Sequence, residues 1–347
     1  MPQKSKGADG YKTFTDSLAA GRIGRFYIFH GEERYLLQRS LGELRKRLCP
    51  DGLDSFNYKR YEDKGFSAAG LEDAIETMPA FADRTLIEIH DFDVFKNSEK
   101  QRFLDAFKSL PDYVCLVLVF SVIPYVPDGR VKINAEILKC AEVIEFALQD
   151  QDKLAKWIMR HFADAGKRIS AADAEYLAFI TGGSMTSLFG EIGKVSAYAK
   201  TETVSREDID AVVTPVLDTV AYKLTDALAR RDHRGAMKLL DELLRMREAP
   251  HKLIFSISLK MRQLLSARAC IESDMGKQAL MDMCGIRHEF QARTLMDTAR
   301  RMTLAGCRSA VLLCAETAFE LNSAPEPESR LTELIVRLAF DRNGTGR

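Results

Sequence analysis

The chain has 347 residues, a length that fits two or three domains of ordinary size. Hydrophobic residues make up 46% and charged residues 29%, a composition that indicates a globular protein with an extensive core and excludes a disordered chain. Fifty basic and fifty acidic side chains give a formal net charge of zero, so any contact with nucleic acid must be local.

The start of the chain, 1–11, is polar and lacks the apolar segment of a secretory signal. The longest uninterrupted apolar run, 114–120, has the length of a strand and is far shorter than the roughly 20 residues of a membrane helix. We therefore expect a cytoplasmic protein without a membrane span. Seven scattered cysteines without a C-x-x-C pair indicate reduced thiols. Cys284 and His288 have the spacing of one helix face, but no second pair completes a metal site, so we expect neither a metal nor a cofactor.

Residues 26–146 predict an α/β domain. Short β-branched or aromatic runs predict strands at 26–29, 56–61, 85–89, 114–120 and 143–146. Between them, apolar residues at helical spacing predict helices at 33–48, 68–77, 99–109 and 134–140. This alternation is typical of crossover units on a parallel sheet.

After Phe146 the sequence predicts helices only. The first is an amphipathic helix that ends at Gly166, and Ser170 with Asp173 predicts a capping box at the next. That helix ends at Gly182, a third spans 188–198, and Ser205 with Asp208 begins a fourth before Pro215. Further helices are predicted at 216–230, 234–247, 252–272, 277–283, 290–301, 303–322 and 330–340. The predicted fold class is an α/β N-terminal domain, 1–146, followed by two all-α domains, 147–215 and 216–347.

The predicted first strand leads into His30-Gly31-Glu32-Glu33, the position of a phosphate loop in a nucleotide-binding domain. A working loop needs glycines, a lysine and a hydroxyl in the pattern G-x-x-x-x-G-K-[ST]. Here there is one glycine and no lysine, and two carboxylates stand where the phosphates would bind. We therefore expect a degenerate site that does not bind ATP.

Other patterns of catalytic residues fail as well. Gly190 to Lys194 has a glycine and a lysine but lies inside a predicted amphipathic helix, and no G-x-S-x-G, H-E-x-x-H or H-R-D pattern occurs. His30 and His90 follow strands, where an active site would lie, but exposed loop histidines are the favoured interpretation. Asp91 and Asp93 resemble a magnesium carboxylate pair without a phosphate loop to use it. We expect a protein that is not an enzyme by itself.

Four stretches together resemble the family of bacterial DNA polymerase III delta subunits. They are F-Y-I-F-H-G-E-E-R-Y-L-L at 26–37, T-M-P-A-F-A-D-R at 77–84, D-G-R-V-K at 128–132, and the helix with Glu191, Lys194 and Tyr198. The resemblance extends over 25–340. It implies an AAA+-like domain without working ATP machinery, a helical lid, and a helical collar that joins clamp-loader subunits in a ring.

The resemblance also implies partners. These are the sliding clamp (the beta subunit of DNA polymerase III), the tau/gamma and delta prime subunits of the clamp loader, and primed DNA within the assembled loader. The delta subunit opens the clamp with a hydrophobic element, which falls here on Met78, Pro79, Ala80 and Phe81. The chain would thus act in DNA replication as part of a DNA-directed DNA polymerase complex.

Residues alone leave two interpretations of this segment. Pro79 prevents smooth continuation of the preceding helix, so the segment should be a loop. From the residues alone, burial of Met78 and Phe81 in the core is favoured; with the resemblance, clamp binding by exposed side chains is favoured. Ala80 is small where many relatives have a larger apolar residue, so its share of the contact stays open.

Basic pairs in the last domain are candidates for DNA contacts. Residues 216–347 hold 21 basic and 17 acidic side chains, a weak signal for nucleic-acid binding. Arg230, Arg231, Arg300 and Arg301, together with Arg245 and Arg247, would meet phosphates in the ring, or lie on solvated helix faces. The rival functions are an active AAA+ ATPase, which lacks its lysine here, and a helical adaptor with a vestigial nucleotide fold, which would not need Met78 and Phe81 exposed.

Overall fold

Two units follow each other along the chain in the computed structural model, Met1–Gln149 and Asp150–Arg347. The structure describes residues 7–49, 54–62, 66–286, 289–323 and 325–340. Each unit has its own core. The predicted fold class, a parallel-sheet α/β part followed by helices only, is confirmed.

Unit 1 contains a five-stranded sheet in the order β2-β3-β4-β1-β5, in which every pairing is parallel. The strands are β1 (Phe26–His30), β2 (Tyr58–Glu62), β3 (Thr85–His90), β4 (Val114–Phe120) and β5 (Glu142–Glu145). All residues of β3 and β4 are buried, because helices cover both faces of the sheet. This double burial explains the continuous apolar run of β4.

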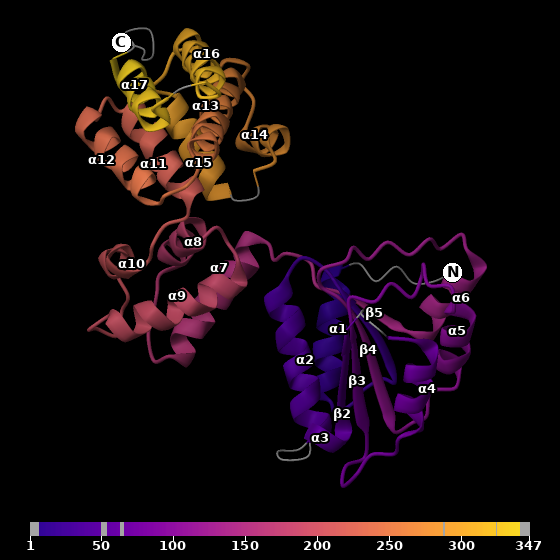
Figure 1. Cartoon of the computed structure of the whole chain (residues 1–347). Helices are drawn as coiled ribbons and strands as arrows, with labels where there is room; N and C mark the ends of the chain where they lie inside the picture. The colour runs from indigo at the N-terminus through magenta and orange to yellow at the C-terminus, as the bar shows by residue number, and fades with distance from the viewer. Residues whose placement is uncertain (1–6, 50–53, 63–65, 287–288, 324, 341–347) are drawn as a thin grey trace. The chain divides into compact units, whose positions relative to one another are not determined.

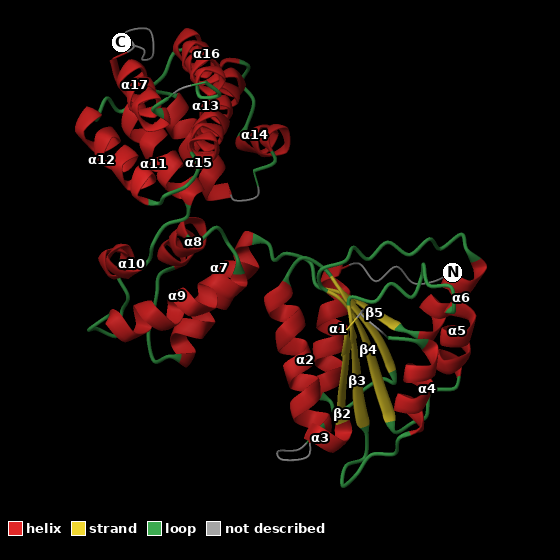
Figure 2. Cartoon of the chain, in the orientation of Figure 1, coloured by secondary structure: helices red, strands yellow, loops and turns green. Residues whose placement is uncertain are grey.

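Helices lie on both faces of the sheet, as Figure 2 shows. One face carries α1 (Gly7–Ala19) and α2 (Arg34–Leu48), and the other carries α4 (Ala68–Glu76), α5 (Lys100–Lys108) and α6 (Lys132–Cys140). The short helix α3 (Asp54–Asn57) directly precedes β2. Because all strands are parallel, every loop that enters a strand lies at one end of the sheet and every loop that leaves a strand lies at the other.

Helix α1 was not predicted, because the polar beginning of the chain obscures its pattern. Phe14 and Leu18 are buried, and the Phe14 ring packs edge-on against Tyr27 and Phe29 with centroid distances of 5.4 and 5.2 Å. The predicted strand at 56–61 is also corrected, since the first two of its residues belong to α3 and β2 begins at Tyr58.

Unit 2 is built from helices. The first four are α7 (Gln151–Asp164), α8 (Ala171–Ile180), α9 (Met185–Tyr198) and α10 (Arg206–Val212). Seven follow: α11 (Leu217–Ala229), α12 (His233–Arg245), α13 (Pro250–Glu272), α14 (Lys277–Cys284), α15 (Glu289–Ala299), α16 (Leu304–Glu320) and α17 (Pro327–Phe340). None of the described helices combines the length and the apolar character needed to cross a membrane.

Of the two predicted capping boxes, the structure contains one in full, at α10, and half of the other, at α8. Ser205 and Asp208 form a full capping box at α10. At α8, Ser170 accepts a hydrogen bond from the Asp173 N–H at 3.0 Å, but its hydroxyl donates to the Asp173 carboxylate at 2.7 Å. The predicted capping box is therefore only half formed at α8, because the Asp173 carboxylate binds the serine hydroxyl.

Within unit 2, the end of α8 contacts the start of α11. The Val216 N–H donates to the Ile180 carbonyl at 2.9 Å, and the Thr219 hydroxyl donates to the Phe179 carbonyl at 3.1 Å. Phe179 also packs edge-on against Tyr222. The structure thus divides the chain once, after Gln149, and the division of unit 2 into lid and collar at 215 stays a prediction.

All seven cysteines are free thiols, five of them buried. In the part of the chain that the structure describes, no group of three or more His, Cys, Asp or Glu side chains has the arrangement of a metal site. His288, the residue paired with Cys284 in the sequence argument, lies outside the described residues.

Candidate functional site

The loop between α4 and β3, residues 77–84, carries two exposed apolar side chains. Helix α4 ends because Thr77 takes an extended ψ of 112° and is followed by a residue that precedes Pro79. Beyond it, Met78 is 74% exposed and Phe81 is 89% exposed. Burial of this pair in the core, the interpretation that the residues alone favour, is therefore wrong.

Phe81 has an unusual backbone conformation, with φ at +59°. Residues other than glycine rarely adopt this left-handed backbone conformation, and a bulky aromatic residue does so only where the surrounding structure holds it there. The loop therefore has a defined turn between the helix and the strand. Its position is at the end of the sheet where β3 begins (Figure 1).

Buried Asn57 holds the middle of this loop. Its amide oxygen accepts from the Ala80 N–H at 2.7 Å, and its amide N–H donates to the Ala80 carbonyl at 2.7 Å. Asn57 is fully buried at the end of α3, and its neighbour Phe56 is 57% exposed. Ala80 thus contributes its backbone to loop structure, whatever its side chain contributes to a contact.

Arg84 fixes the end of the loop. Its guanidinium donates to the carbonyl oxygens of Asp112 at 2.9 Å, Ile23 at 2.7 Å and Gly24 at 3.2 Å. A cavity of about 1020 Å³ adjoins this point and is lined by Phe81 and Arg84 among others. The exposed pair is therefore presented from a loop that hydrogen bonds secure at both its middle and its end.

The predicted degenerate phosphate loop lies at the opposite end of the sheet, where β1 leads into α2. Gly31 has φ at +134°, and a Cβ there would lie 2.3 Å from the Phe146 carbonyl oxygen. The Phe146 N–H donates to the His30 carbonyl at 2.7 Å, and the Glu33 N–H donates to the Phe146 carbonyl at 2.9 Å. The chain after β5 thus packs directly against this loop.

Glu33 itself caps helix α2. Its carboxylate accepts from the Tyr35 N–H at 3.2 Å, and the side chain is buried while that of Glu32 is exposed. Burial raises the pKa of Glu33, and the hydrogen bond from Tyr35 opposes that rise. The helix N-terminus, which binds phosphate in nucleotide sites, is therefore already occupied by a carboxylate of this chain.

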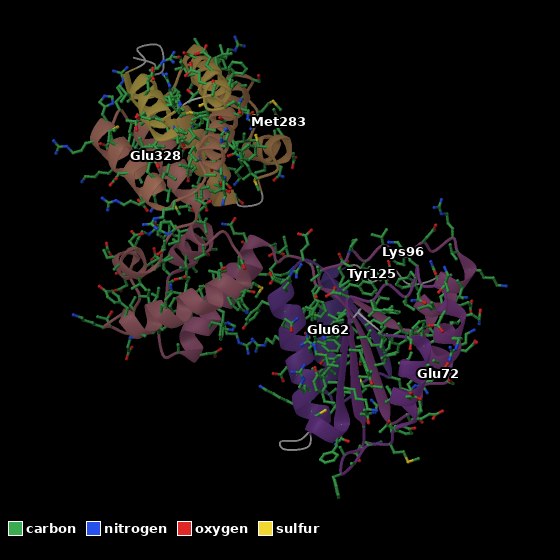
Figure 3. All side chains as sticks on the ribbon, in the orientation of Figure 1. Glu62, Glu72, Lys96, Tyr125, Met283 and Glu328 are labelled. Carbon is green, nitrogen blue, oxygen red and sulfur yellow. The ribbon has the colours of Figure 1, made fainter. Side chains whose placement is uncertain are left out.

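The two histidines considered as exposed loop residues are not exposed: His30 is half-buried and His90 is buried. The His30 ring stacks on Tyr125 (labelled in Figure 3) with centroids 4.0 Å apart, and burial lowers its pKa to about 4. His90 is buried, with its Nε2 2.9 Å from Oε2 of Glu88. That prediction was wrong because both residues are the last of their strands and pack under neighbouring segments.

Asp91 and Asp93 have structural partners. The Asp91 carboxylate accepts hydrogen bonds from the backbone N–H groups of Ser121, Val122 and Ile123 and from the Ser121 hydroxyl. Burial would raise the pKa of Asp91, but these bonds outweigh it and lower the pKa. Asp93 accepts from the Phe95 N–H and pairs with Lys96. Both carboxylates therefore organise the turns after β3 and β4.

Comparisons with known proteins cover both units. The family model for the DNA polymerase III delta subunit matches residues 27–145, and the model for the C-terminal domain of that subunit matches residues 218–337. The two ranges together make up more than half of the chain. This chain belongs to the DNA polymerase III delta subunit family.

Individual relatives agree with this assignment. DNA polymerase III subunit delta of Bacillus subtilis (strain 168) is 22% identical over 337 residues, which are 94% of this chain and 96% of that protein. A probable DNA polymerase III subunit delta of Aquifex aeolicus is 21% identical over 281 residues, 77% of each chain. The solved structure of the Bacillus subtilis DNA clamp loader delta protein has a TM-score of 0.60 at 20% identity and covers 95% of this chain and 99% of that one. The structural likeness shows that the delta-subunit fold extends over both units.

The delta-family helix motif lies on α9. Glu191 and Lys194 form an ion pair of 2.7 Å, and Tyr198, one turn further on, is 53% exposed. Gly190 and Gly193 are inside this helix, so the pattern is not a phosphate loop, as the sequence predicted.

Four of the arginines proposed for DNA lie at neighbouring helix ends in this delta-family chain. Arg230 caps the end of α11, and Arg300 follows the last residue of α15. The Thr298 hydroxyl donates to the Asp226 carboxylate at 2.7 Å and so joins the last turns of the two helices, which Figure 1 shows side by side. The next residue in each case, Arg231 or Arg301, is exposed. Cations are also favourable at helix C-termini by themselves, so DNA contact stays a prediction.

Sequence reasoning missed Asn57 as part of this site. Asn57 and Ala80 are 23 residues apart, and their pairing depends on the placement of α3 beside the α4–β3 loop. The sequence prediction placed Asn57 inside the strand 56–61, whereas in the structure it ends α3. No local pattern therefore marked this asparagine as a residue that holds the loop.

Proposed function

We propose that this delta-family chain is the clamp-loader subunit that binds and opens the sliding clamp of DNA polymerase III, so that the clamp is loaded onto primed DNA. The observation that carries the proposal is the exposure of Met78 and Phe81, 74% and 89%, on a hydrogen-bonded loop of unit 1. A helical adaptor with a vestigial nucleotide fold would have no need of this exposed pair, which favours the clamp-binding function over the adaptor.

Physical chemistry supports the pair as the main contact. A rigid aromatic ring and a flexible thioether together fill an apolar pocket on a partner, and such central side chains commonly dominate binding energy. The hydrogen bonds between Asn57 and Ala80, and those that Arg84 donates, hold the loop before binding, which lowers the entropy cost of association. Clamp opening then requires that the bound loop favours the open clamp over the closed one.

We expect that this chain neither binds nor hydrolyses ATP. The loop after β1 has no lysine, the Glu33 carboxylate occupies the α2 N-terminus, and the Phe146 carbonyl takes the Glu33 N–H. Isothermal titration calorimetry with ATP and magnesium should show no binding heat, with an active AAA+ loader subunit as the positive control. Micromolar binding of ATP would contradict this expectation.

We infer that ATP bound in neighbouring subunits controls the clamp interaction, and that the tau/gamma and delta prime subunits contact the collar, 216–347. The loop that carries Met78 and Phe81 belongs wholly to unit 1, which has its own sheet and core. Arg230, Arg231, Arg300 and Arg301 would meet phosphates of primed DNA in the assembled loader.

A fragment of residues 1–149 is therefore expected to bind the sliding clamp with the affinity of the full chain, but to be absent from the assembled loader. Surface plasmon resonance on immobilised clamp measures the first, and gel filtration with the other loader subunits measures the second. If the fragment enters the loader as well as the full chain does, the assignment of the collar to assembly is wrong. If a folded fragment does not bind the clamp, the contact requires unit 2.

A further inference from the structure

The buried amide of Asn57 makes an unusual pair of contacts with the exposed loop. Both of its polar atoms bond to one residue, Ala80, through that residue's N–H and carbonyl groups, each at 2.7 Å. Asn57 is 0% exposed and Ala80 is half-buried, so the amide itself is shielded from water. The Asn57 amide thus supplies Ala80 with the two backbone hydrogen-bond partners that a neighbouring strand supplies to a residue in a sheet.

Asparagine suits this position because its side chain carries one acceptor and one donor in a planar group. Aspartate would keep the acceptor for the Ala80 N–H but would place a second acceptor against the Ala80 carbonyl. An apolar residue would take this partner away from the N–H and the carbonyl of half-buried Ala80, which is unfavourable.

Asn57 is itself fixed. It is the last residue of α3, and the next residue, Tyr58, pairs with Leu86 in the sheet. The Cys49 thiol, which is buried, donates to the Asn57 carbonyl at 3.4 Å. The residue that holds the loop is therefore attached to the end of α2 and to the β2–β3 pair.

Ala80 stands between the two exposed apolar residues, directly before Phe81 and two residues after Met78. Phe81 has φ at +59°, a conformation that an aromatic residue abandons unless its neighbours restrain it. Restraint of both backbone groups of Ala80 fixes the ψ that leads into Phe81. The direction of the Phe81 ring therefore depends on Asn57.

We propose that Asn57 is a positioning residue for the clamp contact: it holds the α4–β3 loop in the conformation in which Met78 and Phe81 enter the clamp. This inference rests on the proposed function. Asn57 does not touch the clamp, because it is fully buried. It acts by restraint of the loop before binding, so that less conformational freedom is lost when the clamp binds.

The test measures clamp affinity and thermal melting of the full chain with Asn57→Ala. We expect affinity to fall about tenfold, because the loop must then be ordered on binding. The matched control is Asn134→Ala, since Asn134 is also buried in unit 1 and its amide donates to the Asp128 carbonyl at 3.2 Å. The control should lower the melting temperature and leave clamp affinity within about twofold of the unmodified chain.

A double-mutant cycle separates positioning from general stability. In a Phe81→Ala background, Asn57→Ala should change clamp affinity by less than about twofold, because the side chain that it positions is gone. Its effect on melting should persist there. Equal losses of affinity in both backgrounds would mean that Asn57 does not act through Phe81, and unchanged affinity for Asn57→Ala alone would mean that its role is only structural. Either result overturns the inference.

Two further arms keep the result interpretable. If Asn57→Ala does not fold, Asn57→Ser replaces it in the same cycle, because serine leaves a neutral polar group in the buried site but its short hydroxyl lacks the planar acceptor and donor that bond both groups of Ala80. Failure of the proposed function has a different signature: Phe81→Ala and Met78→Ala would then both bind the clamp as the unmodified chain does. Loss of binding in Phe81→Ala with full binding in Asn57→Ala refutes the positioning role alone.

Discussion

Replacement of Phe81 by alanine should weaken binding of the sliding clamp by about 30-fold to nearly 1000-fold and leave the melting temperature unchanged. Truncation of a dominant interface side chain typically costs about 2 to 4 kcal/mol of binding free energy, and 1.4 kcal/mol corresponds to a factor of ten. Stability should not change, because the ring is 89% exposed and contributes little to the core of unit 1. Met78→Ala should act in the same direction with a smaller loss, since its side chain is more flexible.

The experiment pairs two measurements on each variant, clamp affinity by surface plasmon resonance and thermal melting by circular dichroism. Phe319→Ala is the matched control, because Phe319 is 80% exposed on α16 in unit 2. It should keep the clamp affinity of the unmodified chain. A melting temperature that drops in Phe81→Ala would place the ring in the core, and an affinity equal to that of Phe319→Ala would place the clamp contact elsewhere.

Sequence patterns predicted the parts of the fold whose signal is local. The apolar run of β4 and the alternation of strands with helices led to the parallel sheet, and serine caps located α8 and α10. Helix α1 was missed although Tyr11, Phe14 and Leu18 have helical spacing, because the polar residues between them dominate a short window. Local periodicity thus finds elements whose apolar faces are large.

The candidate site was only partly accessible from sequence. A methionine and a phenylalanine between a helix and a strand have the residue types of a core, and only Pro79 and the family resemblance pointed to the surface. The structure adds the reason for their exposure: Ala80 is tied to Asn57, and Phe81 adopts a left-handed conformation. Neither the distant pairing nor the sign of φ has a signature in a single sequence.

The structure gives a second physical reason to expect that the loop after β1 does not bind ATP. The sequence argument was repulsion between phosphate and the two carboxylates of Glu32 and Glu33. In the structure Glu32 is exposed, whereas Glu33 turns back to cap α2 and its N–H bonds to Phe146. The helix N-terminus is thus capped by the Glu33 carboxylate of the chain itself.

A buried ionic cluster beneath β3 leads to the second large effect. The Glu88 carboxylate is fully buried and lies within hydrogen-bond distance of three groups: the Arg45 guanidinium at 3.1 Å, the Tyr58 hydroxyl at 3.0 Å and His90 Nε2 at 2.9 Å. Arg45 also stacks over the Tyr58 ring. Burial by itself would raise the pKa of Glu88, but the hydrogen bond from His90 and the charge of Arg45 outweigh it and lower the pKa.

We expect Arg45→Met to lower the free energy of unfolding of unit 1 by about 3 kcal/mol at neutral pH. Methionine retains much of the packing of the arginine stem, but Glu88 is left as a buried carboxylate without its cation, which commonly costs roughly 3 to 5 kcal/mol. The Arg45 side chain is 37% exposed, and solvent screening of its charge places the expected cost at the lower end. Arg60→Met is the control, since its pair with Glu62 is at the surface and should contribute little.

The pH dependence of this loss has a defined sign. In the unmodified chain the lowered pKa of Glu88 contributes stability that is present above the ordinary pKa of a glutamate and is lost as pH falls through the lowered value. In Arg45→Met the pKa of Glu88 should rise above the ordinary value, so the loss of unfolding free energy is largest at neutral pH. The difference in stability between the two chains should therefore shrink as the pH is lowered from 7 toward 5.

Amide hydrogen exchange in β3 and β4 measures this difference in stability, because the single tryptophan, Trp157, reports only on unit 2. A difference that stays constant over this range would show that Arg45 stabilises the unit through packing on Tyr58 and not through the charge of Glu88.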